Sequence, residues 1–188
     1  ALLNKSNIAK DVADDTIWDA NKKHSRVTLS EDNNTMSVPT GAWASVIANN
    51  GRSVGKYQFE FTSSGMVTGA MAGCANSMYS NVSTYLGSAG TIEESAGFWF
   101  SNGRIYYNNG KEVNTGIGIP INSVLGCCID FVEKTINFYK NGVFVVSLTQ
   151  FLTIGTQSWF PAASAQNTGN VTLRTSNLQY PINGYTAW

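Results

Sequence analysis

The sequence has little charge of either sign. Only 13% of its 188 residues are Asp, Glu, Lys or Arg, and 12 basic residues balance 12 acidic ones, whereas an average soluble protein has about 25% charged residues. Because the positive and negative charges balance, the protein produces no long-range electrostatic field of one sign. We therefore expect no nucleic-acid partner and no attraction to an anionic membrane. The polar surface must come mainly from Asn, Ser, Thr and Gly, which suit hydrogen bonding to neutral partners.

Cysteine is also scarce, and long apolar runs are missing. Three cysteines are too few, and odd in number, for a disulfide framework, which favours a reducing or redox-indifferent setting. No run approaches the ~18 apolar residues that span a bilayer, and the first residues lack the features of a signal peptide. We expect a soluble chain without membrane insertion, which is cytoplasmic unless it is part of a larger assembly. Because the chain starts with Ala, we expect it to be cut from a longer polypeptide.

Short stretches of alternating polarity dominate the sequence from residue 26 onward. In "GKYQFEFT" (55–62), Tyr57, Phe59 and Phe61 would point to one side of a strand, and the polar residues between them to the other. This alternation predicts a strand with one face in the core and the other, including Gln58 and Glu60, in water. We expect the same half-buried pattern in other strands of the chain.

Other segments fit the same all-β organisation. "GMVTGAMAGCA" (65–75) consists of small and apolar residues, which predicts a strand buried on both faces. Four Asn-Gly pairs predict tight hairpin turns, at residues 50–51, 102–103, 109–110 and 141–142. Residues 1–17 are expected to form a lead-in or linker with a weak helical tendency. Residues 18–188 are expected to form one domain.

The stretch "GCCIDFVEKTINFYKNG" (126–142) raises the question of a reactive thiol. Neighbouring side chains in a strand face opposite sides, so Cys127 and Cys128 diverge and are expected to be buried small hydrophobes. The single histidine, His24, lies far away in the polar stretch "NKKHSR". Nothing nearby in the sequence therefore activates a thiolate, and His24 is expected to be a surface residue.

Five motifs occur in the order found in one known family. They are "GKYQFEF" (55–61), "ESAGFWFSNGRIYYNNG" (94–110), "LGCCIDFVEKTINFYKNG" (125–142), "WFPAAS" (159–164) and "YPINGY" (180–185). Over residues 18–188 the chain resembles a SPRY domain. The resemblance implies a bent, lectin-like sandwich of two antiparallel sheets (a jelly roll), which serves as a binding module. The style of "WASVIANNGRSVGKYQFEF" (43–61) is similar to versions in bacteriophage tail and fibre proteins, so a virion origin is expected.

An enzymatic role is the alternative, because lectin-like sandwiches also host glycoside hydrolases with opposed carboxylates. Those enzymes usually place the pair on one strand, and the sequence has no such string. Adjacent acidic pairs at 14–15 and 93–94 would diverge in extended structure. Asp130 with Glu133 could hold a cation, but this spacing is common across turns. We therefore expect no catalytic residue, no cofactor and no metal site.

Loops are the expected recognition surface, because binding residues concentrate on loops held by a rigid scaffold. The candidates are "VPTGAW" (38–43), "STYLGSAG" (83–90) and "SAQNTGN" (164–170). The resemblance implies that these segments match the peptide pocket of animal SPRY domains, with Tyr85 at a pocket tyrosine. It also implies a Trp-Gly pair where this chain has Gln-Asn-Thr-Gly (166–169). Trp43 suits either the core or the site.

We therefore expect ligand binding by four residues: Thr40, Tyr85, Gln166 and Asn167. The function expected first is a phage tail or fibre domain that binds a host-surface glycan or protein through these loops. A neighbouring virion subunit is the other expected partner, in which case the chain is a structural docking domain. An intracellular peptide-binding SPRY adaptor is a further alternative.

Overall fold

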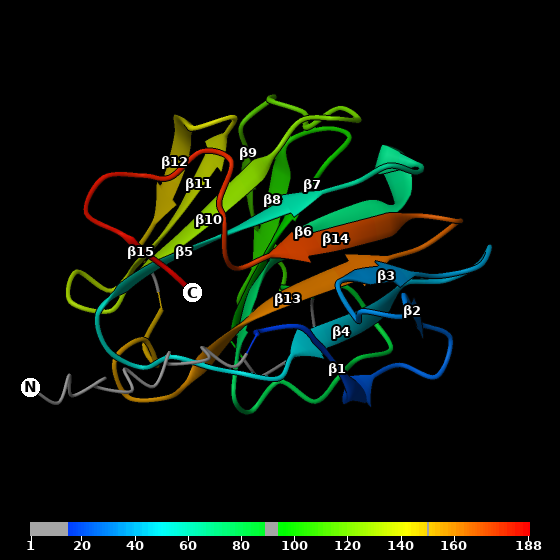
Figure 1. The fold of residues 1–188 in the computed structure, drawn as a ribbon, viewed down its shortest axis with the longest axis horizontal. Coiled ribbons are helices and arrows are strands. Elements are labelled where there is room, and N and C mark those ends of the chain that lie inside the picture. Colours follow the sequence, from blue (N-terminus) through cyan, green and yellow to red (C-terminus); the bar gives the residue numbers. More distant parts are fainter. Residues whose placement is uncertain (1–14, 89–93, 150) are drawn as a thin grey trace, which may run out of the picture.

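The computed structural model of the chain describes residues 15–88, 94–149 and 151–188. Two sheets pack face to face in these residues, and the predicted all-β sandwich is confirmed (Figure 1). The only helical element described is a single 3-10 turn, η1 (Val67–Gly69). Most of the predicted lead-in lies outside the described residues, and residues 15–17 have no regular secondary structure.

One sheet has seven strands, all antiparallel to their neighbours. In spatial order they are β1 (Trp18–Lys23), β4 (Ala44–Ala48), β13 (Trp159–Ala165), β6 (Ala70–Asn76), β7 (Ser95–Trp99), β8 (Arg104–Tyr107) and β9 (Lys111–Asn114). The central strand β6 is buried along its whole length, as predicted. A Cβ on Gly73 would collide with the Ala96 carbonyl of β7, so glycine permits this close pairing. The start of the predicted strand is η1 instead.

The other sheet has eight strands. In order they are β12 (Val143–Leu148), β11 (Thr135–Lys140), β10 (Leu125–Asp130), β5 (Lys56–Thr62), β14 (Asn170–Arg174), β3 (Thr35–Ser37) and β2 (Thr28–Leu29), with β15 (Thr186–Ala187) parallel to β5. The main core fills the space between the two sheets. Its largest fully buried side chains include Trp18, Phe59, Phe61, Phe98 and Trp159.

The outer face of β5 differs from the prediction. Phe59 and Phe61 enter the core and Tyr57 packs at its edge, as expected, but Gln58 and Glu60 are each only 1% exposed. The C-terminal segment, residues 176–188, covers them. Figure 1 shows this segment in red, returning to β5, beside which β15 lies. Alternation in β5 identified the inner face correctly, and the expectation of a wet outer face was wrong because a distant segment lies on it.

Buried hydrogen bonds hold the C-terminal segment on the sheet. The Glu60 carboxylate accepts from the amides of Gln179 (2.8 Å) and Tyr180 (2.7 Å). The Gln58 side chain accepts from the Ile182 amide (2.7 Å) and donates to the Tyr180 carbonyl (2.8 Å). These bonds satisfy polar groups that would otherwise be costly to bury.

Three of the four hairpin turns predicted at Asn-Gly pairs are present. Asn141-Gly142 joins β11 to β12 with φ angles of 48° and 78°, and Asn109-Gly110 lies between β8 and β9 with 63° and 80°. At 102–103, Gly103 has a φ of 70° between β7 and β8. Gly51 has no positive φ, so the expected turn at 50–51 is wrong. Residues 50–51 have no regular secondary structure, and Arg52 forms an isolated bridge with Trp159.

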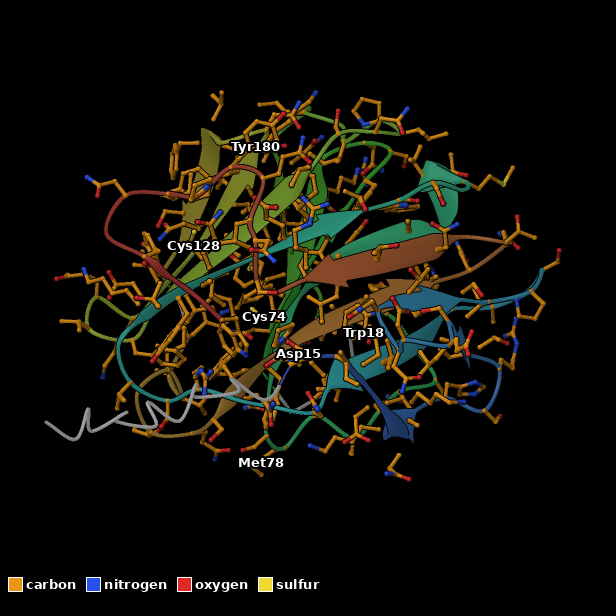
Figure 2. The ribbon with its side chains drawn as sticks, viewed as in Figure 1. Asp15, Trp18, Cys74, Met78, Cys128 and Tyr180 are labelled. Atoms are coloured by element: carbon orange, nitrogen blue, oxygen red, sulfur yellow. The ribbon has the colours of Figure 1, made fainter. Side chains whose placement is uncertain are left out.

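The cysteines are buried and free, which confirms the structural interpretation of residues 126–142. Cys127 points into the core near Cys74, and Cys128 lies on the outer face of β10. Burial raises the pKa of both Cys127 and Cys128. In Figure 2, Cys74 lies near the middle of the ribbon and Tyr180 lies on the C-terminal segment. A thiol whose pKa is raised by burial is a poor nucleophile.

Candidate functional site

A segment that precedes β7 crosses the outer face of the 7-stranded sheet. Ser45 of β4 donates its amide to the Val82 carbonyl (2.8 Å), and its hydroxyl donates to the Thr84 carbonyl. Ser164 of β13 accepts from the Leu86 amide (3.1 Å). Both serines are fully buried and lie 2.7 Å apart through their hydroxyls. These bonds fix the position of residues 82–86, and Tyr85 with them.

A second, smaller core lies between this segment and the sheet. It consists of buried residues on the outward-facing positions of the strands and of residues from the crossing segment: Ile47, Met71, Ala75, Tyr79, Leu86 and Ala162. Its margin contains several half-buried aromatic side chains. Apolar burial thus anchors the crossing segment together with the two serines.

Four of these half-buried aromatic residues surround a small cavity. Trp43, Tyr85, Tyr106 and Trp99 form a circuit, in which successive ring centroids lie 5.7, 5.3 and 6.3 Å apart, and Trp99 closes it on Trp43 at 5.7 Å. The planes of neighbouring rings differ by 46° to 81°. Together with Met71, the rings line a cavity of about 160 Å³. We call these four residues the aromatic box.

Strand alternation explains why the box faces outward. In β7 and just after it, Phe98 and Phe100 enter the main core, so Trp99 points to the opposite face. In β8, Ile105 and Tyr107 point inward, and Tyr106 points outward for the same reason. The indole N–H of Trp99 donates to the Thr68 carbonyl (2.9 Å), which holds this ring in place.

Of the predicted binding residues, Tyr85 is part of the box, and Thr40, Gln166 and Asn167 lie on two loops that contact each other. The Gly41 amide donates to the Asn167 side chain (3.2 Å), so the loops carrying Thr40 and Asn167 meet directly. Thr40 and Asn167 are exposed, whereas Tyr85 and Gln166 are half-buried. Tyr85 joins the same surface through its contact with Trp43, which ends the first loop. The structure therefore brings together loops that lie far apart in the sequence.

The first loop and the 166–169 loop each have a braced backbone. Arg26 donates to the carbonyls of Ala42 (2.9 Å) and Thr40 (3.3 Å). In the other loop the Gln166 amide donates to the Gly69 carbonyl (2.9 Å), and Asn167 has a φ of 48°, a left-handed conformation that Asn tolerates better than most residues. In the stretch around His24 only a surface histidine was expected, and the bracing role of Arg26 was not predicted.

The charged groups near the box balance each other. Arg104 and Glu112 form an ion pair (3.4 Å) on β8 and β9. A hydrogen bond with Tyr106, followed by the field of Glu112, raises the pKa of Arg104. Burial raises the pKa of Tyr85, and the fields of Tyr106 and Glu112 add to this effect. Tyr85 therefore stays neutral, and the pair contributes little net charge to the rim.

The sequence analysis missed two of the four box residues, Trp99 and Tyr106, and left Trp43 open. The alternation in "FWF" (98–100) and "IYY" (105–107) was the available signal. That signal identifies outward-facing aromatic residues, but it does not show that β7 and β8 are neighbours or that the segment with Tyr85 packs beside them. The structure adds this pairing.

Two of the acidic residues considered for catalysis or cation binding, Asp130 and Glu94, have structural partners, whereas residues 14 and 93 lie outside the described residues. Asp130 is paired with Lys56 (2.7 Å) and accepts from the amides of Val132 and Glu133 (3.0 Å each). Glu94 accepts from the amides of Leu152 (2.7 Å) and Thr153 (2.8 Å). Within the described ranges, no group of three His, Cys, Asp or Glu residues could hold a metal ion. The same ranges contain no helix that is long and apolar enough to cross a membrane.

Comparison with known proteins identifies the class of this fold. The SPRY domain family model matches residues 56–177, more than half of the chain, and the chain therefore belongs to the SPRY family. SPRY domains are typically non-catalytic binding modules, and this chain is a SPRY-domain binding module. No curated protein matches the sequence significantly.

Solved structures show the same fold. The SPRY domain of human HERC1 has a TM-score of 0.67 at 17% identity, over 86% of this chain and 99% of that one. Another human SPRY domain has a TM-score of 0.60 at 20% identity, over 81% and 97%. The TRIM65 PSpry domain has a TM-score of 0.65 at 13% identity, over 84% of this chain and 89% of that one. None of these matches supports the expected phage origin.

Proposed function

We propose that this SPRY domain recognises an extended segment of a partner protein along the surface formed by the loops at 38–43, 83–88 and 166–169. The observation that carries the proposal is the contact between these loops. Gly41 binds Asn167 and Trp43 packs on Tyr85, so three segments distant in sequence form one braced surface. Rigid loops of this kind lower the entropic cost of binding.

The chemistry of the surface fits a polar peptide. Thr40 and Asn167 are exposed beside half-buried aromatic rings, and the 12 acidic and 12 basic residues of the chain provide no strong field for a charged polymer. Aromatic rings provide contact area at low entropic cost, and neighbouring amides orient the ligand. A host-surface glycan, expected first from the sequence, is a weaker fit because the four rings stand around a cavity and do not form a flat stacking platform. The virion setting is not part of this proposal.

Selection from a random peptide library on the immobilised domain tests the proposal. We expect enriched peptides to bind wild type, and to lose at least about tenfold in affinity, ~1.4 kcal/mol, with Tyr85→Ala or Asn167→Gly. Glycine is the suitable replacement at 167 because it keeps the positive φ without strain.

Phe144→Ala is the matched control, because Phe144 is an exposed aromatic residue (55%) on β12 of the other sheet. A glycan array run on the same protein distinguishes the carbohydrate alternative. Enrichment of peptides whose binding is equally weakened by Phe144→Ala, or hits on the glycan array alone, would contradict the proposal. A domain that binds neither library but remains attached to subunits of its parent assembly would be a structural docking domain.

A further inference from the structure

We propose that the aromatic box is a binding site for a quaternary ammonium group, and that in the partner protein this group is the side-chain end of a trimethylated lysine. This inference rests on the proposed function, because the peptide that carries the lysine would lie on the adjoining loops. It concerns the box cavity, lined by Trp43, Met71, Tyr85, Trp99 and Tyr106.

The arrangement of the rings favours a compact, rounded group. Each ring contacts two of the other three, at interplanar angles of 81°, 59°, 65° and 46°, and the four rings line a cavity that is partly open to solvent. A flat ligand would need an exposed ring face to stack on. A cation inside such a cavity is attracted by the ring quadrupoles, and cages of aromatic rings recognise quaternary ammonium ligands.

The size of the cavity agrees with this chemistry. An apolar cavity of about 150 Å³ accommodates benzene, and the box cavity measures about 160 Å³. It is therefore large enough for a nitrogen with three methyl groups and the methylene that carries them. Met71 closes its inner end and is fully buried, so a long side chain would enter by its tip only.

The polarity of the lining favours a methylated ammonium over an ordinary one. Of the five described residues that line the cavity, none carries a carboxylate or amide, and the tyrosine hydroxyls are the only side-chain oxygens. An unmethylated ammonium is strongly hydrated and would lose water without gaining enough acceptors. A trimethylammonium group has no N–H donor and loses little. The nearby Arg104–Glu112 pair leaves no net charge to repel it.

The position of the cavity also suits a side chain that projects from a bound peptide. Trp43 is both a wall of the box and the last residue of the loop that carries Thr40 and Gly41. Gly41 in turn holds Asn167. A peptide backbone on the exposed loop residues would therefore pass beside the opening of the box, within reach of a lysine side chain.

Binding of two small probes tests the chemistry of the box. Choline carries the trimethylammonium group, and 3,3-dimethylbutan-1-ol has the same shape without the charge. We expect choline to quench the fluorescence of the domain's tryptophans and to shift the side-chain NMR signals of Trp43 and Trp99. The neutral alcohol should bind about tenfold more weakly, which corresponds to a desolvated cation–π interaction. Equal binding of the two probes, or binding of neither, would overturn the inference.

Variants separate the ring quadrupole from simple apolar contact. Tyr85→Leu and Tyr106→Leu keep apolar bulk but remove an aromatic face, so each should weaken choline binding about three- to tenfold. Tyr85→Phe keeps the ring and should bind choline nearly as wild type does. Phe144→Leu, outside the box, is the control for general effects, and thermal melting verifies that each variant is folded. Unchanged choline binding in both folded leucine variants would contradict the assignment.

Two peptide pools identify the source of the ammonium group. One pool has trimethyllysine at a fixed central position with random flanks, and the other has lysine there. Preferential binding of the methylated pool supports the inference. If choline fails to bind while unmethylated peptides bind in an Asn167-dependent manner, the proposed function stands and this inference falls. A third outcome is that the domain binds choline and phosphatidylcholine vesicles but binds no peptide. The box would then be an ammonium site, but its assignment to a peptide and the proposed function would both be wrong.

Discussion

The two outer faces of the sandwich are covered in contrasting ways. On the 7-stranded sheet, the segment at 79–88 lies on a small apolar core and leaves an aromatic cavity at its edge. On the 8-stranded sheet, the C-terminal segment is held mainly by the buried side chains of Gln58 and Glu60. Both covers combine hydrogen bonds with apolar contacts. Ser45 and Ser164 bond the first segment above its small core, and Trp188 of the second segment packs into the main core. They differ in the side chains below them, which are mostly apolar on the 7-stranded sheet and include a buried carboxylate and a buried amide on the 8-stranded sheet.

This difference suggests a division of roles between the faces. Hydrogen bonds between Glu60 and two backbone amides permit one arrangement of the C-terminal segment, because a displaced amide would be left unpaired. On the other face, Ser45 and Ser164 fix the crossing segment, and the half-buried rings at the margin of the small apolar core remain available to a ligand. The polar cover therefore favours a fixed structure, and the apolar cover favours a binding surface.

The largest loss of stability is expected for a substitution in the main core. This loss is the value against which substitutions on the two outer faces are compared. Phe59→Ala should destabilise the domain by about 3–5 kcal/mol, because it removes a fully buried phenyl group. The ring also contacts Trp188 of the C-terminal segment, with centroids 4.9 Å apart. Chemical denaturation measures the change. A loss below about 1 kcal/mol would show that the core is not packed as described.

The C-terminal segment on the 8-stranded sheet is the polar cover, and the segment at 79–88 on the 7-stranded sheet is the apolar cover. The polar cover should lose more stability when one of its side-chain hydrogen-bond acceptors is removed. Glu60→Ala leaves the amides of Gln179 and Tyr180 without their acceptor and should cost about 2–4 kcal/mol. Glu60→Gln, which keeps one side-chain oxygen, should cost less. Hydrogen exchange should accelerate at the amides of Gln179, Tyr180 and Ile182 and remain unchanged at residues 82–86.

Cysteine labelling provides a second measurement of the same change. Cys74, Cys127 and Cys128 should all react slowly in the native wild type and label fully after denaturation. In Glu60→Ala, Cys128 alone should react faster, since it lies on the outer face of β10 that the C-terminal segment shares. Faster reaction of Cys127 as well would indicate global unfolding and not loss of the cover.

The apolar cover should respond more weakly to loss of a hydrogen bond. Ser164→Ala removes the acceptor for the Leu86 amide and a partner of Ser45, and should cost about 1–2 kcal/mol. The apolar contacts of Leu86 remain, so the segment should stay in place, with faster exchange at the Leu86 amide only. If Ser164→Ala lowered the unfolding free energy more than Glu60→Ala does, the two covers would not differ in the way described.

The smallest expected change in stability concerns Asp130, at the end of β10 in the 8-stranded sheet, and it depends on pH. Burial alone would raise the pKa of Asp130, but hydrogen bonds from Lys56 and from the amides of Glu133 and Val132 outweigh it, so the pKa lies below its ordinary value. The carboxylate therefore stabilises the fold above the unfolded pKa of about 3.9, and this contribution is lost as the pH falls through the lower folded pKa.

Asp130→Asn tests this pH dependence. Wild type should be the more stable protein at pH 6, and the difference in unfolding free energy should shrink between about pH 4 and pH 2. A difference that stays constant over this range, measured by denaturation at each pH, would show that the charge of Asp130 is not involved.

Strand alternation predicted the inner faces and failed on the outer ones. In β5 it identified Phe59 and Phe61 as core residues, because the side-chain period of a strand is a local property. Burial of Gln58 depends on Tyr180, 122 positions later, and no local pattern contains that information. The family resemblance placed Thr40, Tyr85 and Asn167 near one another. The aromatic box needed the additional knowledge that β7 and β8 pair beside the crossing segment.

The strand order also has a consequence for the route to the folded state. In each sheet a strand from the last third of the chain lies between strands from the first half: β13 separates β4 from β6, and β14 separates β3 from β5. The pairs β7–β8 and β10–β11 can form from residues that are close in sequence. Neither sheet can be completed until residues 159–174 have been synthesised. Because such distant pairings slow folding, β4 and β6 expose unpaired edges during synthesis, and the nascent chain is at risk of aggregation until its last third emerges.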